Sequence, residues 1–219
     1  MSDSAAAAPT LLSMTTAFPK YELPQSDVMA RAASFLPDVD QAALERLMPI
    51  YGNAGIERRL SGVPPEWYGE PHGWEEKNQL YLSNAVDLIE EAALKAIEQA
   101  EVDIQEIDMI VSVSTTGIAT PSLDAHLMQR LDFRPDCERL PIFGLGCAGG
   151  VLGLGRAFQL ATGCMDKTIL FVAVELCGLT YRRQDFSKAN VVATALFGDG
   201  AAAGIVKSGG DGERFETCD

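Results

Sequence analysis

One cysteine of this chain stands in a setting that suits covalent chemistry. Cys147 lies within PIFGLGCAGG, residues 141 to 150, between a short apolar run and an apolar pattern of helical period. At the start of a helix, unpaired N–H groups and the helix dipole favour a thiolate. Flanking glycines allow a sharp turn, and backbone N–H groups there suit a developing oxyanion. The residues indicate a thioester-forming nucleophile; the alternative is a small buried apolar side chain.

The same glycines permit a second interpretation. Gly144, Gly146 and Gly149 form the pattern GxGxxG of dinucleotide-binding turns, and the acidic Glu175 ends the next apolar run. Pro141 argues against this reading, because a central strand poorly tolerates a missing N–H group. The pattern also comes late in the chain, with no second nucleotide-binding half after it. We favour the thioester and keep dinucleotide binding as the rival hypothesis.

Composition narrows the classes of function further. The chain has 219 residues and a formal net charge of −14, which argues against nucleic acid and anionic membranes as partners. The N-terminus has no basic region of the kind that opens a signal peptide, and no apolar run reaches membrane-spanning length. The five cysteines are odd in number and form no CxxC pair, which argues against a disulfide framework and a metal site. We expect a cytoplasmic globular protein.

Apolar periodicity predicts the elements that position the cysteine. Strands alternate with helices, which indicates an α/β layered fold. We expect strands over 11–18, 107–113, 140–143 and 167–175, and helices over 26–35, 41–51, 78–100, 123–131 and 148–162. Residues 61–73 are rich in proline and glycine and predict a loop. Residues 195–206 predict one apolar element that bends at its glycines.

Three stretches in order along the chain carry a family resemblance. VSTTGIATPSLDA at 113–125, GLGCAGGVLGL around Cys147 and ALFGDGAAA at 195–203 resemble the type III polyketide synthases, the chalcone and stilbene synthase family. The resemblance covers nearly the whole chain but only the N-terminal part of the family's sequence. It implies the N-terminal half of a thiolase-like αβαβα layered fold. Residues 1–10 would form a flexible N-terminus, 11–208 the thiolase-like domain and 209–219 a tail, with the C-terminal domain absent.

The resemblance also implies a reaction. An acyltransferase of this family loads Cys147 from an acyl-CoA starter and extends it by decarboxylative condensation with malonyl-CoA, as a homodimer without a cofactor. Cysteine at position 177, in AVELCGLT, resembles bacterial alkylpyrone and alkylresorcinol synthases, which implies a fatty acyl-CoA starter. The family pattern assigns further residues as follows: Thr115, Thr116 and Cys177 to the cavity, Thr120 to a contact with the partner subunit, Phe197 to the boundary of the CoA tunnel, and Arg46 to the CoA phosphates.

The chain departs from the family pattern at several positions. Pro49 and Asn53 stand where basic CoA-binding residues are expected, and Arg58 and Arg59 are candidates to replace them. The family's catalytic histidine and asparagine lie downstream of ALFGDGAAA, and neither histidine of this chain matches their context. Two other functions stay open: a β-ketoacyl synthase III-like condensing enzyme, and a non-catalytic half-protein that only dimerises.

Overall fold

A six-stranded mixed sheet forms the centre of the molecule. The computed structural model describes residues 8–35, 41–163, 166–185, 187–209 and 213–214. The strand order is β5-β4-β6-β7-β1-β8, in which β4 runs parallel to β5 and β6 and the other neighbours are antiparallel. The bounds are β1 Thr10–Ala17, β4 Ile107–Ser114, β5 Glu138–Phe143, β6 Thr168–Leu176, β7 Asp199–Lys207 and β8 Glu213–Arg214.

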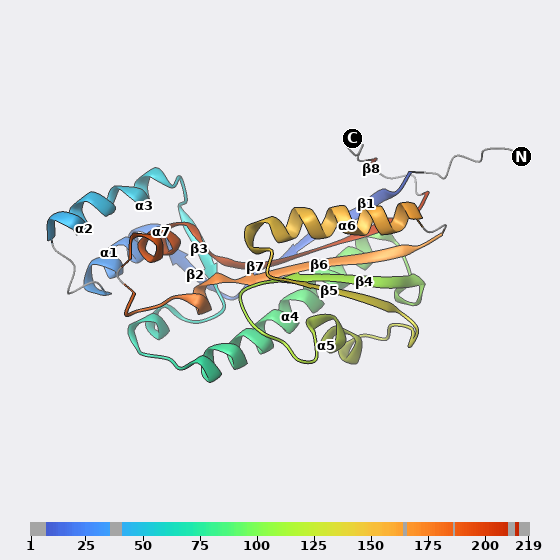
Figure 1. Cartoon of the computed structure of the whole chain (residues 1–219), viewed down its shortest axis with the longest axis horizontal. Coiled ribbons are helices and arrows are strands. Elements are labelled where there is room, and N and C mark those ends of the chain that lie inside the picture. Colours follow the sequence, from blue (N-terminus) through green and yellow to red (C-terminus); the bar gives the residue numbers. More distant parts are fainter. Residues whose placement is uncertain (1–7, 36–40, 164–165, 186, 210–212, 215–219) are drawn as a thin grey trace, which may run out of the picture.

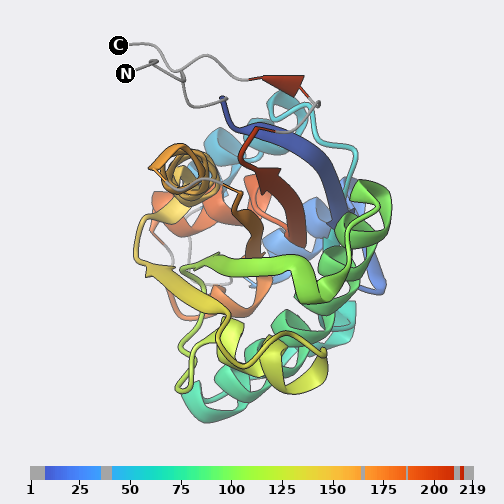
Figure 2. The same cartoon turned by 90° about the vertical axis from the view of Figure 1, so that its right-hand side faces the viewer.

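Helices cover both faces of this sheet. The long helix α4 (Trp74–Ala100) and the shorter α5 (Leu123–Arg130) lie on one face, and α6 (Gly149–Gly163) lies on the other (Figures 1 and 2). The predicted α/β layered arrangement is confirmed. No helix among the described residues is both long and apolar enough to cross a membrane.

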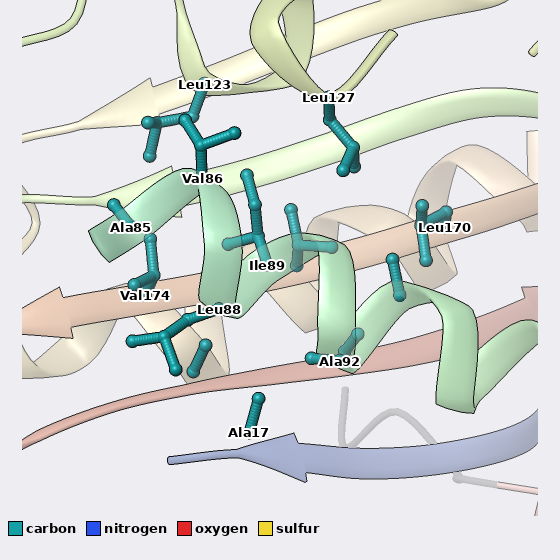
Figure 3. Close-up of a cluster of buried hydrophobic side chains, with 14 of the residues drawn as sticks. Ala17, Ala85, Val86, Leu88, Ile89, Ala92, Leu123, Leu127, Leu170 and Val174 are labelled. Atoms are coloured by element: carbon teal, nitrogen blue, oxygen red, sulfur yellow. The ribbon is translucent and has the colours of Figure 1, made fainter. Parts of the chain in front are cut away.

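The larger of the two main cores lies between α4 and the sheet. Ala85, Ile89 and Ala92 recur at helical spacing on the face of α4 that meets the sheet, and all three are fully buried (Figure 3). Ile89 packs in the same cluster as Leu170 of β6. Burial of each of these two large side chains contributes about 1.5–3 kcal/mol. The small alanines let the helix backbone approach the strands closely.

The second core lies between α6 and the opposite face of the sheet. There, a Cβ atom at Gly149 would lie 2.7 Å from Val113 Cγ1, and one at Gly153 would lie 2.9 Å from Phe171 Cε2. These glycines therefore allow α6 to pack directly against β4 and β6. This contact fixes the position of the helix that follows Cys147.

A group of smaller elements gathers at one end of the sheet, at the left of Figure 1. It holds a two-stranded antiparallel sheet, β2 (Tyr21–Pro24) with β3 (Arg58–Ser61). Four helices surround it: α1 (Gln25–Phe35), α2 (Gln41–Leu47), α3 (Pro49–Asn53) and α7 (Lys188–Leu196). Short 3-10 turns complete the chain: η1 (Pro65–Gly69), η2 (Ile104–Glu106), η3 (Gly146–Ala148) and η4 (Cys177–Thr180).

Several sequence expectations were wrong in detail. The helix expected over 41–51 is two helices, α2 and α3, and the second begins at Pro49, which has no N–H group to continue α2. The loop expected over 61–73 begins with the last residue of β3 and contains η1. The single bent element expected over 195–206 does not exist, because α7 ends at Leu196 and β7 begins at Asp199.

Candidate functional site

Cys147 lies at the end of the sheet where the parallel strands β4, β5 and β6 finish. The turn η3 carries it from β5 directly into α6, and the side chain is exposed. Gly144 and Gly146 have φ angles of 87° and 57°, a left-handed conformation that glycine adopts without a Cβ penalty. The predicted geometry, a sharp glycine turn with the cysteine at a helix N-terminus, is therefore present.

Hydrogen bonds join the three loops that follow these strands. The backbone N–H groups of Thr115 and Thr116 both donate to Glu175 Oε2, at 3.1 and 3.0 Å. The N–H group of Gly146 donates to Thr115 Oγ1 at 3.1 Å, and that of Leu176 donates to Thr116 Oγ1 at 2.8 Å. Thr115 thus supports the turn that holds Cys147, and Thr116 supports the end of β6. Glu175, the acidic residue that the dinucleotide interpretation assigned to a ribose, thus accepts two hydrogen bonds from the protein's own backbone through Oε2.

Cys177 lies in η4, directly after β6, in surroundings that suppress its ionisation. Burial raises the pKa of this thiol to about 12, with smaller contributions from the carboxylates of Asp199 and Glu175 and from the neighbouring Cys147. Asp199 is itself buried, and its carboxylate accepts hydrogen bonds from the N–H groups of Gly62 and Gly178, both within 2.8 Å. Cys177 is therefore a neutral thiol beside the candidate nucleophile.

A cavity of about 120 Å³ opens next to Cys177. Cys177 and Phe197 both line it, so the structure brings together two of the residues predicted to form the substrate cavity. Cys147, Thr115, Thr116 and Thr120 do not line it. Apart from Arg59, the other lining residues come from elements that were not predicted or were assigned no role: Leu23, Val28, Arg31, Pro65, Tyr68, Gly178, Thr180, Tyr181, Asn190, Val191, Ala193 and Thr194.

Arg46 lines a separate pocket on the surface. Arg46, Leu47, Pro49, Ile50 and Asn53 form one side of it, and Lys188 at the start of α7 completes it. The proposed replacements do not reach this pocket. Arg58 pairs with Glu22 at 3.3 Å, whereas the side chain of Arg59 turns inward and is buried. Lys188 is thus a second cation that sequence reasoning missed, because α7 itself was not predicted.

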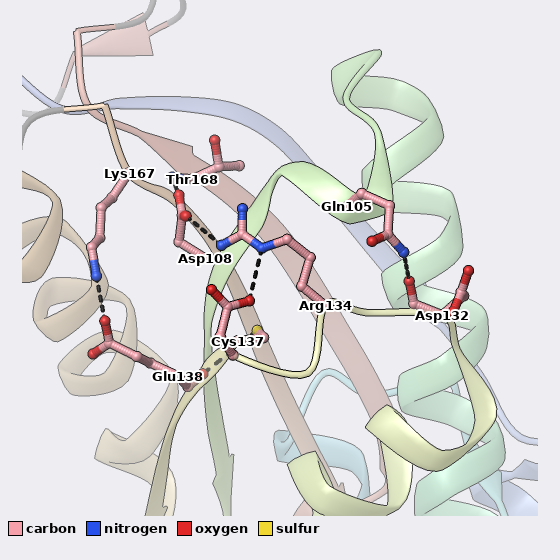
Figure 4. Close-up of polar contacts among 9 residues, drawn as sticks. Gln105, Asp108, Asp132, Arg134, Cys137, Glu138, Lys167 and Thr168 are labelled. Atoms are coloured by element: carbon pink, nitrogen blue, oxygen red, sulfur yellow. Dashed lines mark hydrogen bonds and ion pairs between the residues drawn. The ribbon is translucent and has the colours of Figure 1, made fainter.

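The other polar residues of interest lie away from this site. Thr120 is exposed and precedes the cis bond to Pro121. His72 stacks on Trp67 with ring centroids 3.9 Å apart, and its nitrogens contact Glu76 and the Trp67 carbonyl oxygen. Cys137 is buried just before β5, at the far end of that strand from Cys147, beside the Arg134–Asp108 ion pair (Figure 4). Burial raises the pKa of Cys137 to about 11.

The sequence of this chain is similar to those of known proteins. The N-terminal domain of the chalcone and stilbene synthases matches residues 68–210. A 1,3,6,8-tetrahydroxynaphthalene synthase of Streptomyces peucetius is 42% identical over 91% of this chain, and a phloroglucinol synthase of Pseudomonas fluorescens is 28% identical over 87%. These matches cover 52% and 54% of the two relatives.

A solved structure shows the same fold. The 1,3,6,8-tetrahydroxynaphthalene synthase of Streptomyces coelicolor, described as a bacterial type III polyketide synthase, superposes with a TM-score of 0.87 at 30% identity. The match covers 93% of this chain and 57% of that one. The predicted thiolase-like fold is confirmed, and the chain spans about half the length of the relatives it matches.

Proposed function

Because the chain belongs to the chalcone and stilbene synthase family, we propose that Cys147 is the nucleophile that carries the acyl group of a type III polyketide synthase. The observation that supports this role is the exposed thiol at the N-terminus of α6, next to a loop that bears Cys177 and the cavity. The whole protein would be a CoA-dependent acyltransferase. It would work as a homodimer in which Thr120 faces the partner subunit.

The first chemical step would be transfer of an acyl group to sulfur. The Cys147 thiolate attacks the carbonyl carbon of an acyl-CoA, the negative charge moves to the carbonyl oxygen, and the CoA thiolate leaves. Backbone N–H groups at the start of α6 would stabilise the charge on that oxygen. Arg46 and Lys188, which share one pocket, would bind phosphates of CoA.

The second step would be condensation with malonyl-CoA. Loss of carbon dioxide leaves an enolate, whose carbon attacks the Cys147 thioester and releases the thiolate as the leaving group. Neither His72 nor His126 lies where it could assist this step. His72 is bound to Glu76 and Trp67, and His126 lies in α5 on the opposite face of the sheet from α6. We expect the acid and base groups of this step to come from residues outside this chain.

A fatty acyl starter is the substrate that we propose for the loading step. The cavity beside Cys177 is lined mainly by apolar groups, which suits an alkyl chain. Its volume is about 120 Å³, so a long chain would need additional space. The products would then be alkylpyrones or alkylresorcinols.

The identity of 42% to a tetrahydroxynaphthalene synthase favours a second candidate product. The ring named in that relative carries hydroxyl groups and no alkyl chain. An enzyme with this product would need no long starter.

The direct test starts with acyl loading. The chain is incubated with acetyl-, hexanoyl- and dodecanoyl-CoA, and the adducts are located by intact-mass analysis and peptide mapping. We expect an acyl group on Cys147 in the wild type and none in Cys147→Ser. Saturable NADH binding without any acyl adduct would instead support the dinucleotide hypothesis and reject our proposal.

Labelled malonyl-CoA then separates the two candidate products. It is added to the acylated protein together with the downstream half of the polypeptide. Alkylated pyrones or resorcinols support the fatty starter, whereas tetrahydroxynaphthalene formed without any starter supports the second candidate. A β-ketoacyl synthase III-like enzyme would stop after a single condensation.

A further inference from the structure

The buried guanidinium of Arg59 contacts the backbone of Phe197, and both residues line the cavity. Arg59 is 9% exposed and its hydrogen-bond acceptors are neutral oxygen atoms, while the Asp199 carboxylate lies close enough to act on its charge. Nη1 donates to the carbonyl oxygens of Phe197, at 3.1 Å, and of Thr194, while Nη2 donates to Gln25 Oε1 at 2.9 Å. Burial lowers the pKa of Arg59 from its ordinary value. Burying a cation costs desolvation free energy, and the hydrogen bonds of Arg59 offset that cost.

Gln25 extends the same network around the end of α7. Its Nε2 donates to the carbonyl oxygens of Ala195, at 3.0 Å, and Tyr51, at 3.2 Å. The hydroxyl groups of Tyr51 and Thr194 are 2.7 Å apart. The last turn of α7 contains no basic residue of its own. Arg59, from strand β3, therefore supplies the positive charge that a helix C-terminus favours.

Strand β3 and the residue after it, Gly62, also contact the segment that follows Phe197. A Cβ atom at Gly198 would lie 3.3 Å from Arg59 Cβ, so the two backbones are in close contact there. One residue later, the Asp199 carboxylate accepts the N–H group of Gly62 at 2.8 Å. Residues 59 to 62 thus fix the chain on both sides of Phe197, whose ring is left free to line the cavity with Cys177.

We propose that Arg59 is a positioning residue for Phe197 and that it thereby sets the length of the alkyl chain admitted beside Cys177. This inference rests on the proposed acyl-transfer function and adds a determinant of its specificity. Without the two carbonyl contacts, only Gln25 and Tyr51 hold the end of α7, and the Phe197 ring is no longer fixed in the cavity wall. Longer alkyl chains can then enter the cavity beside Cys177.

The test measures entry into the cavity separately from catalysis. Methyl, butyl and dodecyl methanethiosulfonates are reacted with the Cys147→Ser chain, and peptide mapping gives the rate of Cys177 labelling by each reagent. Because ionisation of Cys177 affects all three rates alike, the ratio of dodecyl to methyl labelling reports the admitted length. We expect Arg59→Met to raise this ratio about tenfold, the factor that corresponds to loss of one hydrogen bond to a charged group.

Neighbouring substitutions provide the controls. Arg58→Met changes the same residue type one position earlier on β3, where the side chain is 70% exposed, and should leave the ratio unchanged. Arg59→Lys keeps the charge and should restore part of the wild-type ratio. If Arg59→Met does not fold, Gln25→Met, which removes the Nη2 acceptor and the donor to Ala195, should raise the ratio in its place.

A double mutant separates positioning from a general effect on stability. If Arg59 acts through Phe197, Arg59→Met should add little to the ratio in a Phe197→Ala background. An additive increase, or an unchanged ratio in a folded Arg59→Met chain, would overturn the inference. Loading of Cys147 from acyl-CoAs of increasing length is measured in parallel. Failure of the wild type to load would reject the proposed function, while the Cys177 ratio would still decide the role of Arg59.

Discussion

Cys147, Cys137 and Cys177 occupy three different environments. Cys147 is exposed at a helix N-terminus, whereas burial raises the pKa of Cys137 to about 11 and that of Cys177 to about 12. Since the thiolate is the reactive form, the two raised pKa values slow alkylation at neutral pH. We therefore predict that limiting iodoacetamide at pH 7.5 labels Cys147 first among these three residues, as quantified by peptide mapping. Earlier labelling of Cys137 would contradict this.

The Cys177 thiol also predicts a pH dependence of stability. Its pKa in the folded state lies above the ordinary value of 9.0, so the folded chain holds the thiol proton more tightly than the unfolded chain. The resulting contribution to the free energy of unfolding is fully present below about pH 9 and is lost as the pH rises towards 12. We expect the melting temperature of the wild type to fall more steeply between pH 8.5 and 10.5 than that of Cys177→Ala. Parallel curves of melting temperature against pH for the two proteins would show that folding does not raise the pKa of this thiol.

At the scale of elements, the contact between α6 and the sheet depends on small residues, of which Gly153 is one. A Cβ atom at Gly153 would overlap Val113 Cγ2 and crowd Phe171, whereas a Cβ atom at Gly155 would meet nothing within 4 Å. We predict that Gly153→Ala lowers the free energy of unfolding by about 1–3 kcal/mol, because α6 must move away from β4.

The matched control lies two residues further along the same helix. Gly155→Ala should raise the free energy of unfolding by about 0.4–1 kcal/mol, because the unfolded chain loses conformational freedom. Urea denaturation of both variants gives the comparison. Equal effects at the two positions would show that α6 is not closely packed on the sheet.

Elements whose apolar pattern is set by one large contact were predictable from the sequence. The residues of α4 repeat at helical spacing because one face meets the sheet, and β6 is a continuous apolar run because both its faces are covered. The pair β2 and β3 was not predicted, because each strand has four residues and Pro24 ends the first. The helix α7 was missed because its sequence KANVVATAL contains β-branched residues that also suit a strand.

The candidate site also has a part that could be predicted from the sequence and a part that could not. The turn around Cys147 was predictable, because glycine spacing and the start of a helix are local features. The roles of Arg59, Gln25 and Lys188 were not, since each depends on contacts with α7 that join distant parts of the chain. Whether Arg59 points inward and Arg58 outward follows from the register of β3 with β2, and a single sequence does not reveal that register.

At the scale of the whole molecule, large apolar side chains are exposed between the end of β5 and the first turn of α6. Phe143, Leu145, Val151 and Leu152 all belong to this stretch, and Val151 is 79% exposed. Monomeric proteins seldom leave such a cluster in water. We therefore predict that the 219-residue chain self-associates in solution.

Sedimentation velocity across a range of concentrations tests this prediction. Val151→Lys together with Leu152→Lys should shift the distribution towards monomer. Leu94→Lys, at a residue of α4 that is 46% exposed on the other face of the molecule, should not. A wild-type chain that stays monomeric at high concentration would contradict the prediction.

The order of the strands has a consequence for how the chain folds as it is synthesised. β1 pairs with β7 from Thr10 opposite Lys207, a separation of 207 − 10 = 197 residues. At 5–20 residues per second, β7 leaves the ribosome roughly 10–40 seconds after β1. Over that interval β1 has no strand partner. The helix α4, which packs on both β1 and β7, meets only part of its final packing surface. We expect the parallel unit of β4, β5 and β6 to assemble first and the N-terminal strand to be the last long strand to join the sheet.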